Sequence, residues 1–299
     1  MPWGTFSVVA ADLAAGEWGG AVASRFLAVG SLVLFARAGV GAVATQSFIN
    51  TDYGPRGLDL CAKDWTAQRA LEALTSADEE RGVRQAGIVD RAGTPANFTG
   101  SACVPWAGGA TGQGFAVQGN MLAGPAVVSA MAEAMTKTSG SLARRMYAAL
   151  VAGDRAGGDK RGRQAASILV CRDKGGYGGR NDRSLDLRVD DHPDPVTELG
   201  RLLDLHDLYL PPEGTLRAVP VDSRQAQQIQ AWLSRLGYWQ APPDGQWTDA
   251  LAARLYDYMF TENLELREQK GPFVDRQVLD YLQRHAEALG DAPKRHAEA

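Results

Sequence analysis

Hydrophobic and polar positions divide the first 210 residues into short strands and amphipathic helices. Apolar or alternating runs predict strands over residues 5–11, 19–26, 32–35, 42–45, 84–90, 99–105, 115–118, 165–171 and 186–189. Leu and Ala at helical spacing predict helices over residues 57–61, 66–75, 125–136, 142–151 and 199–205. The elements come in blocks and not as regular strand–helix–strand units, so we expect antiparallel sheets layered with helices.

The pattern changes after Pro211-Pro212, where Pro and Gly are typical of a linker. Beyond it, helical spacing predicts a helix capped by Ser223, a second helix after Thr248 and a third over residues 274–289. The sequence therefore predicts a mixed α+β domain over residues 1–210 and a linker over 211–222. A small three-helix domain over 223–290 and a disordered tail over 291–299 complete the prediction.

Charge and hydropathy restrict the partners. The chain has 299 residues, 45% of them hydrophobic, and a formal net charge of -4 with no basic stripe, which argues against nucleic acid as a partner. Its most apolar run, residues 26–35, is too short to cross a bilayer and predicts a buried strand. Because no signal-peptide pattern is apparent at the start, we expect the cytoplasm and no membrane partner.

Neither a metal nor a cofactor is expected. Three widely separated cysteines, Cys61, Cys103 and Cys171, lack zinc-ligand spacing and are predicted to be buried thiols. An oxygen-rich segment contains Asp186, Asp190, Asp191, His192 and Asp194. Residues at odd spacing on a strand point to different faces, and the prolines after His192 and Asp194 indicate turns, so metal binding is the lesser interpretation.

Polar chemistry elsewhere is limited. No His precedes His192 and no Gly-x-Ser-x-Gly motif occurs, which disfavours a Ser/His/Asp triad. The basic loop 157–163 either binds an anionic group, lies at a subunit contact or is simply solvated. In the first strand, alternation puts Thr5 and Ser7 on one face, which by pattern alone is ordinary for a strand.

Motifs spread along residues 5–210 resemble a bacterial family of unknown function, numbered 1028. They begin with Thr5-Phe-Ser-Val-Val-Ala and Tyr53-Gly-Pro-Arg-Gly-Leu. Further along, the chain contains Gln118-Gly-Asn-Met-Leu-Ala-Gly, Gly157-Gly-Asp-Lys-Arg-Gly-Arg-Gln and Asp186-Leu-Arg-Val-Asp-Asp-His-Pro. That family is considered similar to the N-terminal-nucleophile hydrolases, whose fold is a four-layer αββα sandwich and whose activity is cleavage of amide bonds.

The resemblance implies a set of site residues. Thr5 would be the nucleophile, and its free α-amine, with a reference pKa of about 8, would be the base. Arg25 or Arg37 would supply a nearby cation. The backbone around Thr45 and Gln46 would form the oxyanion hole, and Asn120 would assist the amine.

Three residues complicate this assignment, because Pro2, Trp3 and Gly4 follow Met1 and precede Thr5. Removal of Met1 would expose Pro2, so Thr5 becomes N-terminal only if the Gly4–Thr5 bond is cut. A Gly–Thr junction resembles the self-cleavage site of proteasome-type members. We therefore expect autocatalytic cleavage at this bond, and an inactive domain without it.

Residues 223–289 resemble a peptidoglycan-binding domain. The resemblance rests on Gln230-Ala-Trp-Leu-Ser-Arg-Leu-Gly-Tyr-Trp and on Pro243-Asp-Gly-Gln-Trp-Thr. Trp239 and Trp247 either stack on sugar rings or pack in the core.

Three hypotheses follow for the whole chain. The first is a hydrolase acting on a small amide or peptide-like substrate. The second is a non-catalytic protein that keeps the fold and binds a ligand or peptidoglycan fragments. The third is an assembly protein whose C-terminal domain mediates a homo-oligomer, the state that we also expect of the hydrolase.

Overall fold

The computed structural model describes residues 4–212 and 214–291, which fold as two compact units that divide between Leu202 and Leu203. The division falls inside helix α6 (Pro195–Tyr209). Pro2, Trp3 and residues 292–299 of the predicted tail lie outside the described residues.

A six-stranded antiparallel sheet forms the centre of the first unit, in the order β10-β9-β2-β1-β8-β7. Its strands are β1 (Thr5–Asp12), β2 (Glu17–Ser24), β7 (Gly108–Gly112), β8 (Phe115–Asn120), β9 (Ala165–Arg172) and β10 (Arg183–Val189). The predicted hairpin of the first two strands is confirmed, with Thr5 opposite Ser24 and Asp12 opposite Glu17. Gly16 closes the turn at a φ of 66°, a conformation that costs glycine little.

A second antiparallel sheet packs face to face on the first, in the order β3-β4-β5-β6. It contains β3 (Leu34–Arg37), β4 (Gly41–Ser47), β5 (Arg84–Asp90) and β6 (Pro95–Thr99). Apolar side chains of both sheets fill the space between them, among them Val9, Val22, Ala44 and Val89. The hydrophobic effect of this burial holds the two sheets together.

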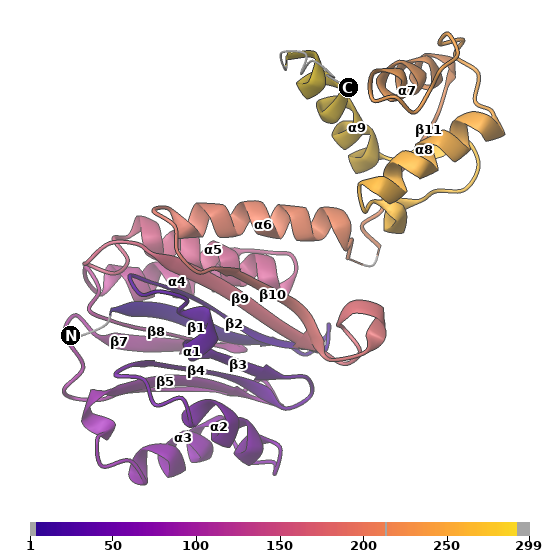
Figure 1. Ribbon diagram of the computed structural model, residues 1–299. Coiled ribbons are helices and arrows are strands. Elements are labelled where there is room, and N and C mark those ends of the chain that lie inside the picture. The colour runs from indigo at the N-terminus through magenta and orange to yellow at the C-terminus, as the bar shows by residue number, and fades with distance from the viewer. Residues whose placement is uncertain (1–3, 213, 292–299) are drawn as a thin grey trace, which may run out of the picture. The chain divides into compact units, whose positions relative to one another are not determined.

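Helices cover the outer faces of both sheets (Figure 1). The first sheet carries α4 (Ala126–Lys137) and α5 (Leu142–Arg155), and the second carries α2 (Tyr53–Cys61) and α3 (Ala67–Ser76). Side chains of Thr66 and Ser141 cap α3 and α5 by accepting from backbone N–H groups three residues on. Strand β1 is therefore buried on both faces, and its polar residues Thr5 and Ser7 lie inside the protein.

Two predicted strands are wrong. Residues 26–35 do not form one strand, because Ala28 has a φ of 51° and the short helix α1 (Gly30–Val33) precedes β3. Val29 and Val33, four residues apart, are both buried, and a short apolar run cannot distinguish this spacing from a strand. Residues 100–105 form turns after β6, and the Gly-rich edge strand β7, which has little apolar alternation, was not predicted.

The second unit has three helices within the part of it that the structure describes beyond α6: α7 (Ser223–Arg235), α8 (Asp249–Thr261) and α9 (Arg276–Asp291). Asp222, and not Ser223, caps α7 through a capping box with Gln225. Strands β11 (Ala218–Pro220) and β12 (Phe273–Asp275) form a two-stranded sheet that the sequence did not indicate. Leu208 at the end of α6 belongs to this unit's core.

Candidate functional site

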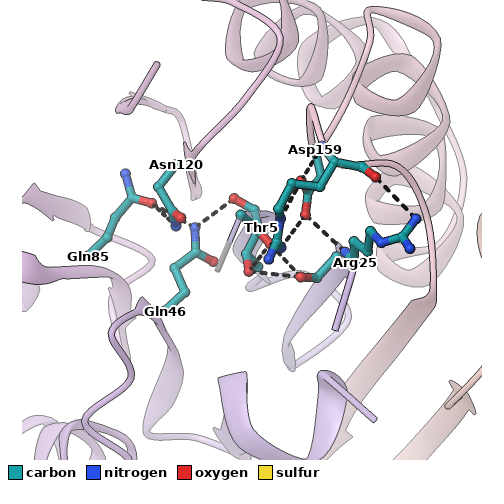
Figure 2. Close-up of polar contacts among 9 residues, drawn as sticks. Thr5, Arg25, Gln46, Gln85, Asn120 and Asp159 are labelled. Carbon is teal, nitrogen blue, oxygen red and sulfur yellow. Dashed lines mark hydrogen bonds and ion pairs between the residues drawn. The ribbon is translucent and has the colours of Figure 1, made fainter. Parts of the chain in front are cut away.

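Thr5 lies at the first position of β1, between Ser24 of β2 and Asn120 of β8. Thr5 is buried, with 3% of its surface exposed. The Thr5 hydroxyl oxygen lies 2.6 Å from the carbonyl oxygen of Gly4 and 3.1 Å from the hydroxyl oxygen of Ser24 (Figure 2). The side chain is therefore held against the peptide bond that precedes it.

The Gly4 carbonyl accepts hydrogen bonds from several side chains. Arg161 donates from Nη2 at 2.9 Å, and the Ser24 hydroxyl donates at a short distance. A cationic donor on a carbonyl oxygen polarises the C=O bond and stabilises negative charge on that oxygen. The Gly4–Thr5 peptide therefore combines a nearby hydroxyl with donors that favour a developing oxyanion.

Asp159 holds Arg161 in this position. Its side chain is 1% exposed and pairs with Arg161 Nη2 at 2.6 Å. It also accepts from the backbone N–H groups of Arg25 and Arg161, each at 2.9 Å. These donors compensate the burial of the carboxylate charge, and the ion pair directs Arg161 toward Gly4.

A buried amide cluster, defined by Gln46, Gln85, Gln118 and Asn120, fills the space between the sheets next to Thr5. All four residues are 0% exposed. Gln46 Nε2 lies 3.3 Å from the carbonyl oxygen of Thr5 and donates to Gln85 Oε1 at 2.9 Å. Asn120 Nδ2 donates to the same Gln85 oxygen at 3.0 Å (Figure 2).

Ser7 joins this cluster from β1. Its hydroxyl donates to Gln46 Oε1 at 2.6 Å and accepts from Gln118 Nε2 at 2.7 Å. Two acceptors in the cluster, Gln118 Oε1 and Asn120 Oδ1, are buried without a hydrogen-bond partner among the described residues. Such atoms are costly to bury, and they mark places where a further donor would be stabilised.

The structure brings together only some of the predicted site residues. Gln46 contacts the Thr5 carbonyl, and Asn120 lies opposite Thr5 on β8. Arg25 reaches the site through its backbone N–H, while its exposed side chain donates to the carbonyl of Arg161 at 3.2 Å. Thr45 hydrogen-bonds to the carbonyl of Asn50, on the other face of β4 from Gln46.

Arg37 lies far from Thr5. Arg37 pairs with Gly41, at the opposite end of β4 from Gln46. At the usual rise of a strand, Gly41 and Gln46 are about 17 Å apart. The Arg37 side chain forms an exposed ion pair with Asp59 at 3.2 Å.

Sequence reasoning missed the site roles of Ser24, Asp159 and Arg161. Asp159 and Arg161 lie in the loop 157–163, which the sequence singled out as basic and as part of a family motif, with no role for either residue. The available signals were this motif and the acidic residue within the basic run.

A pocket of about 460 Å³ opens beside this site. Ser24 and Asp159, which contact Gly4, contribute to its wall. The wall also contains Phe6, Ala23, Arg25, Asp154, Gly157, Gly162, Arg163, Pro193, Pro195 and Val196. A concave site with apolar walls and a few polar groups is typical of small-molecule binding.

The oxygen-rich segment does not converge on one point. Asp186 pairs with Arg183, Asp191 accepts from Gln164, and His192 Nδ1 accepts from the backbone of Asp194. Within the described ranges, no group of three or more His, Cys, Asp or Glu side chains is arranged to hold a metal ion.

The three cysteines are buried, as predicted. Burial raises the pKa of Cys61 to about 11 and that of Cys171 to about 12, which suppresses the thiolate. In residues 4–212 and 214–291, no helix is long and apolar enough to cross a membrane.

Comparison with known proteins assigns the first unit to a protein family. The model of a family described as "Family of unknown function (DUF1028)" matches residues 5–199. The chain belongs to this family. A crystal structure of the family, that of the protein SPO2555 from Silicibacter pomeroyi, is 32% identical in sequence with a TM-score of 0.63. The match covers 68% of this chain and 86% of that one.

Residues 212–282 match a second family model, described as "Putative peptidoglycan binding domain". No match was found among curated proteins. The fold of the first unit is thus shared with a solved structure of the family.

The second unit has its own pocket, of about 300 Å³. Trp247, Tyr256 and Phe273 contribute aromatic surface to it, and Asp249, Glu268 and Lys270 contribute charge. Trp239 and Trp247 are both half-buried against the helical core, and only Trp247 also lines the pocket.

Proposed function

We propose that the first unit is an amide hydrolase of the N-terminal-nucleophile type, with a four-layer αββα sandwich and Thr5 as nucleophile. One observation carries the proposal: the Thr5 hydroxyl lies 2.6 Å from the Gly4 carbonyl oxygen, which Arg161 also contacts at 2.9 Å. A hydroxyl beside a polarised carbonyl is the arrangement that acyl transfer needs.

The first reaction in this proposal is cleavage of the chain itself. Thr5 Oγ1 attacks the carbonyl carbon of Gly4, and Arg161 and the Ser24 hydroxyl stabilise the oxyanion. The C–N bond then breaks, and the hydroxyl proton passes to the nitrogen of Thr5. Water hydrolyses the resulting ester, which releases the Gly4 carboxylate and regenerates the hydroxyl beside a free α-amine.

The same groups would then act on a substrate amide. Departure of Gly4 leaves Arg161 and Ser24 directed at the position where a substrate carbonyl oxygen can bind. In this proposal they take the oxyanion role that the resemblance assigned to the backbone of Thr45 and Gln46. Asn120 Oδ1, an unpartnered acceptor opposite Thr5, can accept a hydrogen bond from the new amine and orient its lone pair.

The decisive experiment is the intact mass of the purified protein, followed over time. We expect the wild-type chain to lose the residues ahead of Thr5, Thr5→Ala to retain them, and Thr5→Ser to lose them because it keeps the hydroxyl. Thr45→Ala serves as the control, since its hydroxyl contacts Asn50 on the other face of β4. A wild-type mass that retains Gly4 after prolonged incubation rules out this mechanism.

We propose a second function for the C-terminal unit, binding of peptidoglycan fragments. The family match over residues 212–282 and an aromatic pocket that combines Trp247 and Tyr256 with charged groups support it. Aromatic faces beside polar groups suit the alternating apolar and hydroxyl surfaces of sugars. A cytoplasmic location and a homo-oligomer remain predictions from the sequence.

A further inference from the structure

The pocket beside Thr5 has two chemically different parts. Phe6, Ala23 and Val196 provide apolar surface. Ser24 donates to the Gly4 carbonyl, and Asp159 pairs with Arg161, which donates to the same carbonyl. A group bound at the position of that carbonyl can therefore extend a short apolar chain along the wall.

Most charges in this wall are already compensated. Asp159 is paired with Arg161. Arg163 forms two parallel bonds with Asp154, at 2.7 and 2.8 Å. Such bidentate pairs are internally neutral and leave little attraction for a ligand charge.

Arg25 is the exception. It follows Ser24 directly and lines the pocket, and its one hydrogen bond from the side chain goes to a neutral carbonyl, that of Arg161. In the part of the chain that the structure describes, no carboxylate lies within ion-pair distance of Arg25. A guanidinium has five N–H donors, so most of its capacity is available to a planar anion.

Two further features favour an anion at this place. Pro195 and Val196, the first residues of α6, line the same pocket, and the first turn of a helix carries partial positive charge. Glu198 in that turn is paired with Arg201 and does not line the pocket. A second hollow, of about 250 Å³, shares Arg25, Arg163 and Pro193 with the first, so that Arg25 is accessible from both. Asp191 also lines this second hollow, where it accepts a hydrogen bond from Gln164.

We infer that this pocket selects amides whose acyl chain is short, apolar along its length and ended by a carboxylate that pairs with Arg25. The inference rests on the proposed function, because it names the substrate class of that same site. It assigns Arg25 to substrate recognition, in place of the role of a cation beside the nucleophile that the resemblance implied.

Binding of a product-like acid tests this inference independently of catalysis. Glutarate is the probe, and glutaramide is its uncharged counterpart of nearly equal size. Calorimetric titration of the full chain is expected to show glutarate binding at least about tenfold more tightly than glutaramide, since charge-assisted hydrogen bonds are stronger than neutral ones.

The variant Arg25→Gln removes the charge and should weaken glutarate binding about tenfold or more, while Arg25→Lys should retain part of it. Arg91→Gln is the matched control, because Arg91 is half exposed, lies in the turn after β5 and pairs with Asp64 in the turn after α2; neither residue lines the pocket. We expect both Arg25 variants to keep the fold, because residue 25 donates to Asp159 from its backbone N–H, which the substitutions retain. Thermal unfolding of each variant verifies this.

The outcomes separate the two proposals. Equal binding of glutarate by Arg25→Gln and wild type, equal binding of diacid and diamide, or no glutarate binding by wild type would each overturn the pocket assignment. If Thr5 is never released but binding depends on Arg25, the hydrolase proposal fails while the anion pocket stands. If Thr5 is released but substitution of Arg25 does not change glutarate binding, the hydrolase proposal stands and the anion pocket is ruled out.

Discussion

The carboxylate of Asp159 lies against the Cα atom of Gly4, so that a Cβ atom built on residue 4 would be 2.7 Å from Asp159 Oδ1. Gly4 is therefore required by space and not by backbone conformation. This contact joins the loop that carries Arg161 to the peptide bond that we propose is cut.

Gly4→Ala should slow release of Thr5 strongly, because the added methyl group displaces Asp159 and with it Arg161. Overpacking of this kind also costs about 1–3 kcal/mol of stability. Intact mass over time measures the release. Gly124→Ala is the control, since a Cβ there meets nothing within 4 Å. Release at the wild-type rate in Gly4→Ala would show that the Asp159 contact is not part of the reaction.

Asp159→Asn should lower the free energy of unfolding by about 2–3 kcal/mol and abolish release of Thr5, because Arg161 loses the partner that directs it to Gly4. Urea unfolding and intact mass give the two readouts. Asp12→Asn breaks a pair with Arg145 that is about one-quarter exposed, and should cost about 1 kcal/mol without affecting release. Release in both variants would leave Asp159 with a purely structural role.

Gly87→Ala should disrupt the buried amide cluster, since a Cβ there would lie 2.2 Å from Gln118 Oε1. Moving that amide breaks its 2.7 Å bond to the Ser7 hydroxyl, and we expect a loss of about 1–3 kcal/mol in urea unfolding. Gly82→Ala is the matched control, because the nearest atom to its Cβ is 3.8 Å away. Similar stability of the two variants would contradict the tight packing of the cluster.

Asp78 should make the free energy of unfolding depend on pH in the acidic range. Hydrogen bonds from Arg84 first, and also from Asn50 and Tyr53, hold the pKa of Asp78 well below its usual range. A carboxyl with a lowered pKa in the folded state stabilises the protein above the unfolded value of about 3.9 and loses this effect as the pH falls below it.

The free energy of urea unfolding, measured between pH 6 and pH 3, should therefore fall less steeply in Asp78→Asn than in wild type. Glu133→Gln is the control, because its bond to Lys137 is exposed and screened by solvent. Identical pH dependence in Asp78→Asn and wild type would show that this carboxyl does not contribute.

Trp247→Ala should weaken co-sedimentation of the full chain with purified peptidoglycan about tenfold, since the indole contributes aromatic surface to the pocket of the second unit. Tyr177→Ala removes an aromatic ring that is 83% exposed in the first unit and should have no effect. If the Trp247 variant stays folded by circular dichroism and sediments like wild type, the pocket is not the binding site.

The hydrophobic pattern of the sequence predicted those strands and helices whose buried residues recur at the spacing of the element. The β1–β2 hairpin, the strand β9 and the capped helices α3 and α5 all appear near their expected positions. The run over residues 26–35 failed because a turn at Ala28 separates equally apolar segments, and composition carries no record of that turn.

Some residues of the candidate site were also named from the sequence, and others only from the structure. Thr5, Gln46 and Asn120 were named through resemblance to a family, and they do adjoin one another. Arg37 was named by the same route and lies at the far end of its strand pair. The motif that contains Asp159 and Arg161 did not indicate their roles, because these depend on contact with a residue more than 150 positions away.

The sequence by itself determined the mixed class of the fold, the antiparallel strands, the helical C-terminal unit and the presence of a hydroxyl at the start of the first strand. Only the tertiary structure decided what surrounds that hydroxyl. Strand order places β2 and β8 on either side of β1, and the loop after α5 brings Asp159 and Arg161 to Gly4. Periodicity records which face of an element is buried, whereas the convergence of polar groups depends on long-range packing that no local pattern encodes.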